Sequence, residues 1–279
     1  MSLSPYRLIA IDIDGTLLNS QRQITPRTLQ AIEKAIAGGK RVALCTGRSL
    51  QSARAIAEQT HPEAILIFHS GALIFETLNG PLLKAVNLPR ALAFEIIAYF
   101  KKEGYDPLVY ESVPEGLHFW YEPPRSDNEW QRRYIEGSGP RACQIADLWD
   151  APFVDPAQVA IAGSQEAIDR MRACLSERWP EIGVILSRST LVGVNWFMEV
   201  VPAQVSKAQG LAVLGTTYNI DPQEMIAVGD NFNDLDMIEY AGLGVAMGNA
   251  PEAVKESADF VAPSNDEEGV AYVIERFFL

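Results

Sequence analysis

The chain has 279 residues, of which 48% are hydrophobic and 21% are charged. This length predicts about two domains, and the composition excludes a largely disordered chain. The 36 acidic and 23 basic side chains give a net charge of −13, which argues against nucleic acid or an anionic membrane as a partner because the overall field repels both.

The three cysteines, Cys45, Cys143 and Cys174, lack the spacing of a metal site or a redox pair. An odd number of thiols without a disulfide pattern is typical of a reducing compartment. The N-terminus shows no leader pattern, and no apolar run approaches the roughly 18 residues of a membrane span. We therefore expect a cytoplasmic protein without membrane association, either a monomer or a small homo-oligomer.

The first part of the chain alternates between strand and helix patterns. The segment from Leu8 to Ile13 is apolar except for Asp12, and an amphipathic stretch from Pro26 to Ala37 follows it, with Thr25 as the predicted N-cap. The next predicted elements are a strand, a helix and a strand at residues 41–45, 49–59 and 64–68. Apolar strands that alternate with helices predict a parallel α/β sheet that is buried on both faces.

This alternation is lost from about residue 86 and returns after residue 200. Between these points we expect helices at 91–102, 130–136 and 165–178, and short strands at 108–110, 117–121, 159–162, 184–186 and 196–200. The last predicted elements alternate as helix, strand, helix, strand and helix at 207–214, 225–228, 233–240, 244–246 and 267–277. The pattern predicts a core formed by residues 1–85 and 201–279, with an α+β domain at residues 86–200 inserted into it.

Two acidic motifs follow predicted core strands. Asp12 and Asp14 stand two positions apart in the sequence Asp-Ile-Asp-Gly-Thr-Leu, and Asp230, Asn233 and Asp234 belong to Gly-Asp-Asn-Phe-Asn-Asp. Acids at the carboxyl ends of buried parallel strands are costly unless positive charge neutralises them. A bound divalent cation would supply that charge, although each motif alone is also compatible with a polar turn.

Two further motifs suit a phosphate group. Thr46, Gly47 and Arg48 place a hydroxyl and backbone N–H groups before a helix, although a structural turn with Ser49 as the helix cap has the same sequence. Lys207 opens the helix that restarts the core, where its charge opposes the helix dipole and indicates a nearby anion. A solvated surface lysine is the alternative. Because all four motifs lie at the edge of one predicted core, their joint occurrence favours a single site.

These four motifs resemble those of the haloacid dehalogenase superfamily of phosphohydrolases, and the resemblance covers the whole chain. The long insert before Lys207 resembles the type IIB, Cof-like branch, which implies an α/β fold with a Rossmann-like parallel-sheet core and an inserted α+β cap of the C2 type. The implied activity is Mg²⁺-dependent hydrolysis of small phosphorylated metabolites, with sugar phosphates first and flavin or pyridoxal phosphates second. A phosphomutase or phosphotransferase acting on sugar phosphates, or a non-catalytic sensor of a phosphorylated ligand, would carry similar motifs.

The resemblance also implies roles for individual residues. Asp12 would be the nucleophile that forms an aspartyl-phosphate, and Asp14 would be the general acid and base. The catalytic set would be Asp12, Asp14, Thr46 and Lys207. Mg²⁺ would be held by Asp12, Asp14, Asp230 and, through water, Asp234. The phosphoryl oxygens would be bound by Thr46, Gly47, Arg48, Lys207 and Asn233.

Two positions depart from the family pattern. Members often carry Asn-Gly-Ala after the third strand, whereas this chain has Ser70 in place of the Asn, preceded by His69. The Gly that commonly follows the lysine is Ala208 here, which is a better helix former. Cys45 is expected to be a buried packing residue and not a second nucleophile.

Aromatic side chains in the insert allow two interpretations. They are Tyr110, His118, Phe119, Trp120 and Tyr121. Such residues could line a substrate surface, or they could form the core of the insert itself, where aromatic residues pack well on strands.

Overall fold

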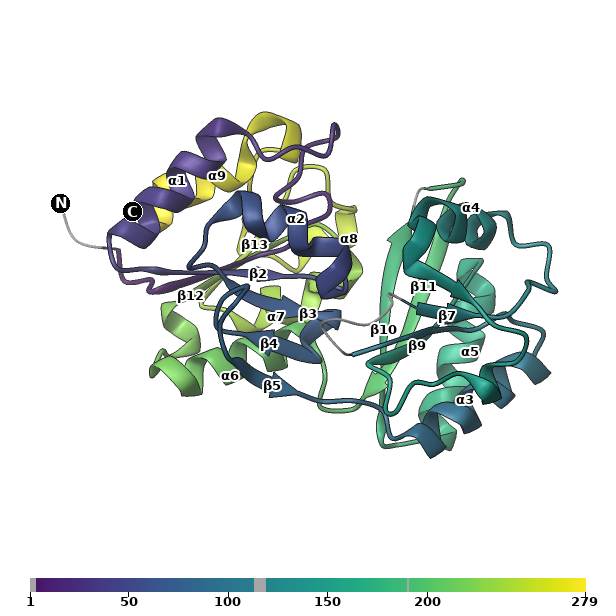
Figure 1. Cartoon of the computed structure of the whole chain (residues 1–279). Helices are drawn as coiled ribbons and strands as arrows, with labels where there is room; N and C mark the ends of the chain where they lie inside the picture. The colour runs from purple at the N-terminus through teal and green to yellow at the C-terminus, as the bar shows by residue number, and fades with distance from the viewer. Residues whose placement is uncertain (1–3, 113–118, 190) are drawn as a thin grey trace. The chain divides into compact units, whose positions relative to one another are not determined.

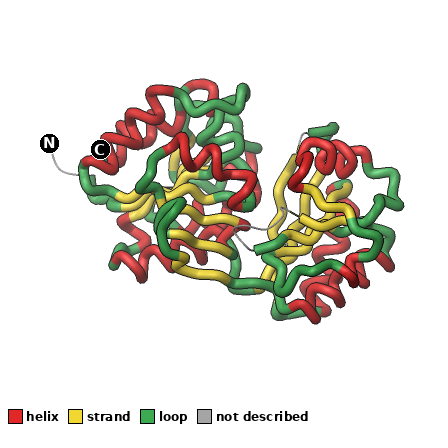
Figure 2. Tube along the Cα trace, in the orientation of Figure 1, coloured by secondary structure: helices red, strands yellow, loops and turns green. Residues whose placement is uncertain are grey.

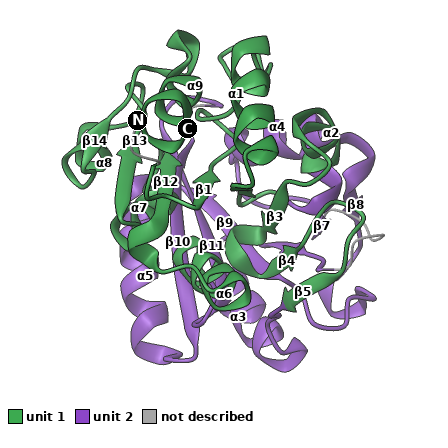
Figure 3. Cartoon of the chain, turned by 90° about the vertical axis from the view of Figure 1, so that its left-hand side faces the viewer, with its two compact units in different colours: residues 1–48, 53–84, 206–279 green, residues 49–52, 85–205 purple. Residues whose placement is uncertain are grey.

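The computed structural model describes residues 4–112, 119–189 and 191–279 (Figure 1). The chain divides into two compact units, which Figure 3 shows in different colours. Unit 1 comprises Met1–Arg48, Ala53–Lys84 and Ser206–Leu279, and unit 2 comprises Ser49–Ser52 and Ala85–Val205. Each unit has its own β-sheet with helices packed against it (Figure 2).

The sheet of unit 1 has eight strands among the described residues, in the order β14-β13-β12-β1-β2-β3-β4-β5. Their bounds are β1 (Leu8–Ile11), β2 (Arg41–Cys45), β3 (Ile65–Phe68), β4 (Leu73–Phe75), β5 (Leu82–Ala85), β12 (Met225–Gly229), β13 (Leu243–Ala246) and β14 (Phe260–Val261). The strands from β14 to β3 pair in parallel, as the alternation of strands and helices predicts. The sheet continues with β4, which is antiparallel to β3 and which the sequence analysis did not predict.

Helices cover both faces of this sheet. Their bounds are α1 (Pro26–Ala37), α2 (Leu50–Thr60), α6 (Lys207–Tyr218), α7 (Leu235–Tyr240), α8 (Glu252–Glu256) and α9 (Gly269–Val273). The helices α1 and α9 lie side by side on one face, and α6 and α7 lie on the other (Figure 1). The predicted N-cap of α1 is present, because the Thr25 side chain accepts a hydrogen bond from the backbone N–H of Thr28. Apolar residues of the sheet and of α6 and α7 form a common core.

Unit 2 contains a second sheet, whose order over the described strands is β10-β11-β9-β6-β7-β8. The bounds are β6 (Leu108–Tyr110), β7 (Phe119–Tyr121), β8 (Ala142–Gln144), β9 (Gln158–Gly163), β10 (Ile182–Ser189) and β11 (Asn195–Pro202). The strands pair antiparallel except β7 with β8. Its helices are α3 (Arg90–Lys102), α4 (Glu129–Ser138) and α5 (Gln165–Arg178).

The aromatic residues singled out in the insert mostly belong to the interior of unit 2. Tyr110 and Phe119 are buried in one apolar cluster, and the hydroxyl of Tyr110 donates to that of Tyr134 on α4 at 2.9 Å. Trp120 and Tyr121 are half-buried. His118 lies outside the described residues. For Tyr110 and Phe119 the packing interpretation accounts for the environment observed.

No helix in the described part of the chain is both long enough and apolar enough to cross a membrane.

Candidate active site

The candidate site lies at the carboxyl ends of three adjacent parallel strands of unit 1. The strand β1 pairs with β2 on one side and with β12 on the other. Asp12 follows β1 directly, Thr46 follows β2 and Asp230 follows β12. The backbone N–H of Asp12 donates to the carbonyl of Val228 at 3.0 Å, which holds the first motif against β12. Three of the four motifs therefore meet at one edge of the sheet, where open α/β sheets bind ligands.

The fourth motif reaches the same edge through a buried lysine. Lys207 is the first residue of α6, and its side chain is fully buried. Its Nζ lies 2.6 Å from Oδ1 of Asp12 and 2.5 Å from Oδ1 of Asp234. The anions found beside this lysine are therefore carboxylates of the protein itself.

The start of α6 is fixed by hydrogen bonds to its backbone. The Ser206 hydroxyl accepts a hydrogen bond from the backbone N–H of Gln209 at 3.2 Å. The Asp236 carboxylate accepts one from the backbone N–H of Ala208 at 2.9 Å. These caps satisfy N–H groups that a helix otherwise leaves unpaired, so the position of Lys207 is set by its neighbours on both sides.

Three carboxylates gather around the lysine. Asp12, Asp230 and Asp234 each offer an oxygen atom, and these atoms all lie within 4.8 Å of one another. Asp234 is fully buried, and its Oδ2 accepts hydrogen bonds from the backbone N–H groups of Asp230 and Asn231 at 3.0 and 2.9 Å. Oδ1 of Asp230 accepts a hydrogen bond from the Thr16 hydroxyl at 3.0 Å. Asp234 therefore holds both the Lys207 side chain and the loop at Asp230 and Asn231, and it also belongs to the acidic cluster.

Arg48 and Asp14 form a separate ion pair in the same unit. The guanidinium donates two hydrogen bonds to the carboxylate, from Nε at 2.6 Å and from Nη2 at 2.5 Å. The side chain of Asp14 is 55% exposed, unlike the buried Asp12. The family resemblance implies a phosphate contact for Arg48, whereas in the structure its guanidinium contacts Asp14.

The charges of the site do not balance. Among the residues that the structure describes, the four carboxylates of Asp12, Asp14, Asp230 and Asp234 form ion pairs with two cationic side chains, Lys207 and Arg48. With all six groups ionised, two negative charges remain uncompensated. Oxygen donors with an excess of two negative charges suit a hard divalent cation.

The protonation behaviour of the cluster reflects this excess. Burial, together with the charges of Asp234, Asp230 and Asp14, raises the pKa of Asp12 well above its usual value, although Lys207 opposes the shift. Burial and the charge of Asp234 raise the pKa of Asp230 to about 7. Burial alone would lower the pKa of Lys207, but the charges of Asp12 and Asp234 outweigh it and raise that pKa well above the usual value. Burial and neighbouring negative charge raise the pKa of Asp12 and Asp230 because too little positive charge lies beside them. A bound metal ion would supply that charge, so the donor set fits a metal ion.

The remaining predicted residues lie in the loops of the site and form no hydrogen bond to the clustered carboxylates among the described residues. Thr46 is buried, and its hydroxyl accepts a hydrogen bond from the backbone N–H of Arg48 at 3.1 Å. Gly47 and Asn233 are half-buried, and Asn233 lies in the short helical turn Phe232–Asp234. Over residues 4–112, 119–189 and 191–279, none of the hydrogen bonds joins Thr46, Gly47 or Asn233 to the three clustered carboxylates.

Two residues that support the site were not found from the sequence. Gly15 has a φ of +81°, and a Cβ at this position would lie 2.3 Å from Oδ2 of Asp230, so only glycine allows this approach. The side-chain N–H of Asn249 donates to the carbonyl of Gly15 at 2.8 Å and approaches Oδ2 of Asp230 at 3.5 Å. Asn249 follows β13, another parallel strand of the same sheet. A polar residue beyond such a strand end is the signal that could have identified it.

Cys45 and Ser70 lie next to the site in sequence or in space. Cys45 is buried, and burial raises the pKa of its thiol, which keeps the thiol protonated and supports a packing role. Ser70 is buried at the end of β3, and its backbone N–H donates to the carbonyl of Thr46 at 2.9 Å. Its hydroxyl has no hydrogen-bond partner within the described part of the chain.

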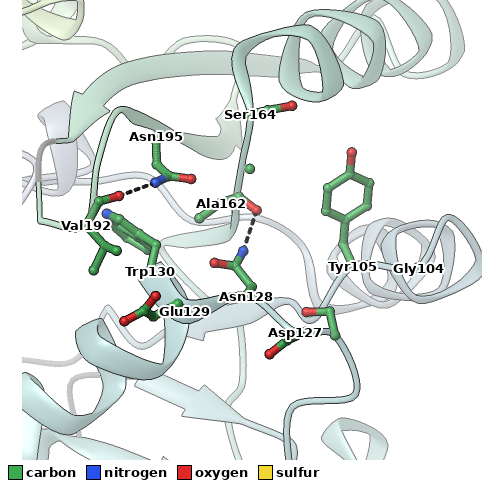
Figure 4. A pocket seen from close by; sticks show the side chains of 12 residues that line it. Gly104, Tyr105, Asp127, Asn128, Glu129, Trp130, Ala162, Ser164, Val192 and Asn195 are labelled. Atoms are coloured by element: carbon green, nitrogen blue, oxygen red, sulfur yellow. Dashed lines mark hydrogen bonds between the residues drawn. The ribbon is translucent and has the colours of Figure 1, made fainter.

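Unit 2 contains a pocket of about 410 Å³ that shares no residue with this site (Figure 4). Its lining includes the carboxylates of Asp127 and Glu129 and no lysine or arginine, which disfavours a phosphate group. The side-chain N–H groups of Asn128 and Asn195 donate to the carbonyls of Ala162 and Val192, as the dashed lines show. The phosphate chemistry expected from the sequence is therefore better placed in unit 1.

Comparison with known proteins decides the family. A model of the haloacid dehalogenase-like hydrolases matches residues 9–274. The chain belongs to the haloacid dehalogenase-like hydrolase family. It is 31% identical to the stress response protein YhaX of Bacillus subtilis, over 98% of this chain and 93% of the relative. It is 26% identical to 5-amino-6-(5-phospho-D-ribitylamino)uracil phosphatase YitU of the same organism, over 100% and 99% of the two chains.

Solved structures of haloacid dehalogenase-like proteins share the fold. A Bacillus subtilis haloacid dehalogenase-like hydrolase superposes with a TM-score of 0.80 at 27% identity, covering 97% of this chain and 99% of the other. The subclass IIB sugar phosphatase BT4131 superposes with a TM-score of 0.78 at 21% identity, covering 98% and 100%. The predicted fold class, an α/β core with an inserted cap, is confirmed, and both sheets are mixed. The chain is a haloacid dehalogenase-like phosphatase of small phosphorylated metabolites.

Proposed function

We propose that this phosphatase hydrolyses phosphate monoesters with Mg²⁺ and with Asp12 as the covalent nucleophile. The observation that carries the proposal is the environment of the Asp12 carboxylate. It stands at the carboxyl end of β1 with Oδ1 held by Lys207 at 2.6 Å, and two further carboxylates lie within 4.8 Å. A nucleophile that is held by a cation and placed beside a metal-binding donor set is what transfer of a phosphoryl group requires.

The proposed reaction has two steps. The free oxygen of Asp12 attacks phosphorus, the bond between phosphorus and the ester oxygen breaks, and Asp14 gives its proton to the leaving alcohol. Asp14 then takes a proton from water, the resulting hydroxide attacks phosphorus, and the aspartyl-phosphate bond breaks to release phosphate and restore Asp12. Because Arg48 now holds the Asp14 carboxylate, we propose that Arg48 turns to the ester phosphate when substrate binds, which releases Asp14 to take up from solvent the proton that it gives to the leaving alcohol.

Mg²⁺ would be held by the carboxylates of Asp12 and Asp230 and by the backbone carbonyl of Asp14, with Asp234 close to it. When bound, the ion supplies positive charge to the phosphoryl oxygens and cancels the excess negative charge of the site. Lys207 neutralises Asp12 and would bind a phosphoryl oxygen together with Thr46, Gly47 and Asn233. These groups would stabilise the negative charge that develops on the phosphoryl oxygens in the transition state, and this stabilisation would increase the rate.

For the substrate we propose sugar phosphates first and phosphates of flavin or pyridoxal type second. The relative YitU is named for a substrate that carries a phosphorylated ribityl chain, and that substrate combines a polyol phosphate with a uracil ring. A phosphoribityl compound therefore belongs in any test panel beside hexose phosphates, pentose phosphates, flavin mononucleotide and pyridoxal phosphate.

The test is phosphate release from this panel, with Mg²⁺ and with a chelator, by the wild type and by Asp12→Asn. We expect metal-dependent release by the wild type and a loss of at least about 10³-fold in kcat for Asp12→Asn, because an amide is a poor nucleophile. Asp169→Asn on the exposed surface of α5 is the matched control and should keep wild-type activity. Melting curves show whether each variant is folded.

Three outcomes would contradict the proposal. Near-normal turnover by a folded Asp12→Asn would exclude Asp12 as the nucleophile. Transfer of the phosphoryl group to an added sugar, with negligible release of phosphate, would indicate a phosphotransferase or mutase. Binding of a phosphorylated ligand without any turnover would indicate a sensor.

A further inference from the structure

The turn between β3 and β4 has an unusual backbone. His69, Ser70 and Gly71 have φ values of +47°, +53° and +109° in succession. Residues other than glycine rarely adopt positive φ, and they do so where surrounding structure enforces it. Here the backbone N–H groups of His69 and Ser70 donate to the carbonyls of Arg48 and Thr46 at 3.0 and 2.9 Å. The strained turn is therefore tied to the loop that follows β2.

The same turn also presses against the beginning of α6. A Cβ at position 71 would lie 2.3 Å from the carbonyl oxygen and 3.0 Å from the carbonyl carbon of Ser206. That carbonyl accepts the first hydrogen bond of the helix, from the backbone N–H of Gly210 at 3.0 Å. Gly71 thus packs on the backbone of the residue that precedes Lys207, at a distance that excludes any other side chain.

We propose that the turn His69–Gly71 is a positioning device for Lys207. It packs closely on the Ser206 carbonyl, while the Asp236 carboxylate accepts a hydrogen bond from the backbone N–H of Ala208. The residues before and after Lys207 are therefore both held in place. The Nζ of Lys207 then meets Asp12 and Asp234 at hydrogen-bond distance. The role of Gly71 in turnover rests on the proposed function, in which Lys207 neutralises Asp12 and binds the phosphoryl group.

The test compares Gly71→Ala with Gly39→Ala. Gly39 also has a positive φ, +80°, but a Cβ there would meet no heavy atom within 4 Å. Both substitutions force alanine into a left-handed conformation, and only that at position 71 pushes on Ser206. The readouts are kcat and KM per folded molecule with p-nitrophenyl phosphate and Mg²⁺, at a temperature below both unfolding transitions as recorded by circular dichroism.

We expect kcat of Gly71→Ala to fall by about 100-fold, since a displacement of about 1 Å in a catalytic group costs this much. Its KM should change far less, because the contacts of Lys207 strengthen in the transition state. Gly39→Ala should keep the wild-type kcat even if it melts earlier. Equal kcat values for the two folded variants would overturn the proposal.

Gly210→Ala provides the test if Gly71→Ala does not fold. A Cβ at position 210 would lie 3.1 and 3.2 Å from two methyl carbons of Ile67 and 3.8 Å from the Cα of Gly71. Alanine is also the better helix former, so the variant should fold with α6 displaced slightly from Ile67 on β3, the strand that leads into the turn. A severalfold fall in kcat is expected, and an unchanged kcat would overturn the proposal. Wild-type enzyme that releases no phosphate would instead count against the proposed function, so the two failures are distinguishable.

Discussion

At the scale of single residues, the site combines a buried lysine with more negative charge than the protein neutralises. Lys207 contacts Asp12 and Asp234, while Asp230 has no cationic side chain at hydrogen-bond distance among the described residues. Burying charge is costly unless it is paired. The raised pKa values of Asp12 and Asp230 are the consequence of this imbalance, and a bound divalent cation would reverse them.

This imbalance predicts a pH-dependent stabilisation by Mg²⁺. With its pKa raised to about 7, Asp230 binds more protons in the folded than in the unfolded protein, so its contribution to metal-free stability is present at low pH and is lost as the pH rises through about 7. Mg²⁺ requires the carboxylate form. The difference in melting temperature between Mg²⁺ and chelator should therefore grow from about pH 5.5 to about pH 8.

The size of this effect follows from mass action. At about 100 times its dissociation constant, Mg²⁺ should add about 2.7 kcal/mol to the free energy of unfolding of the metal-binding unit. Differential scanning calorimetry measures the shift, and Asp230→Asn is the control in which most of it should disappear. A shift that is equal at both pH values, or that survives in Asp230→Asn, would contradict this account of the cluster.

At the scale of elements, the sequence predicted strongly periodic segments well and short irregular ones poorly. The helix at 26–37 and the strand at 41–45 have the predicted bounds. The short strands β4, β5, β8 and β14 and the helix α8 were missed, because a segment of two to five residues is recognised only where a clear apolar run is bounded by polar or turn residues. The helix predicted at 267–277 is interrupted at Glu268, whose φ is +65°, a conformation that its residue type does not signal.

The loops of the site were also predicted only in part from the sequence. Motif spacing predicted that Asp12, Asp230, Asp234 and Lys207 belong together, because the carboxyl ends of parallel strands share one edge. Spacing could not predict that Arg48 pairs with Asp14, since an arginine beside a phosphate site suits either anion. Asn249 was missed because its hydrogen bond to the backbone carbonyl of Gly15 cannot be inferred from the sequence, so its place beyond a strand end was the only available signal.

Asn249→Ala should weaken Mg²⁺ binding without unfolding the protein. The substitution removes the hydrogen bond to the carbonyl of Gly15, worth about 0.5–1.5 kcal/mol, and frees the loop that places Asp14 and packs against Asp230. We expect a loss of up to about tenfold in Mg²⁺ affinity, measured by calorimetric titration. Asn195→Ala in unit 2 removes a similar bond to the Val192 carbonyl, and its Mg²⁺ affinity should equal that of the wild type.

At the scale of the whole molecule, the sequence predicts a core that is interrupted by an inserted segment. The prediction rests on the loss of the alternation between strands and helices and on its return later in the chain. The residues that make up the site all belong to unit 1, although Asp12 and Lys207 are 195 positions apart. We propose that residues 86–200 fold as a cap domain that selects the substrate. The residues that would do so could not be predicted, because aromatic residues of a small core and those of a binding surface have the same sequence pattern.

The central claim is that Asp12 carries the phosphoryl group during turnover. The most direct measurement is the stereochemical course at phosphorus, with a phosphorothioate ester made chiral by its sulfur and two oxygen isotopes and with the reaction run in water that carries the third isotope. Each in-line displacement inverts the configuration, so two successive displacements through Asp12 predict overall retention in the released chiral thiophosphate. Overall inversion would mean that water attacks the ester directly, and it would contradict the account.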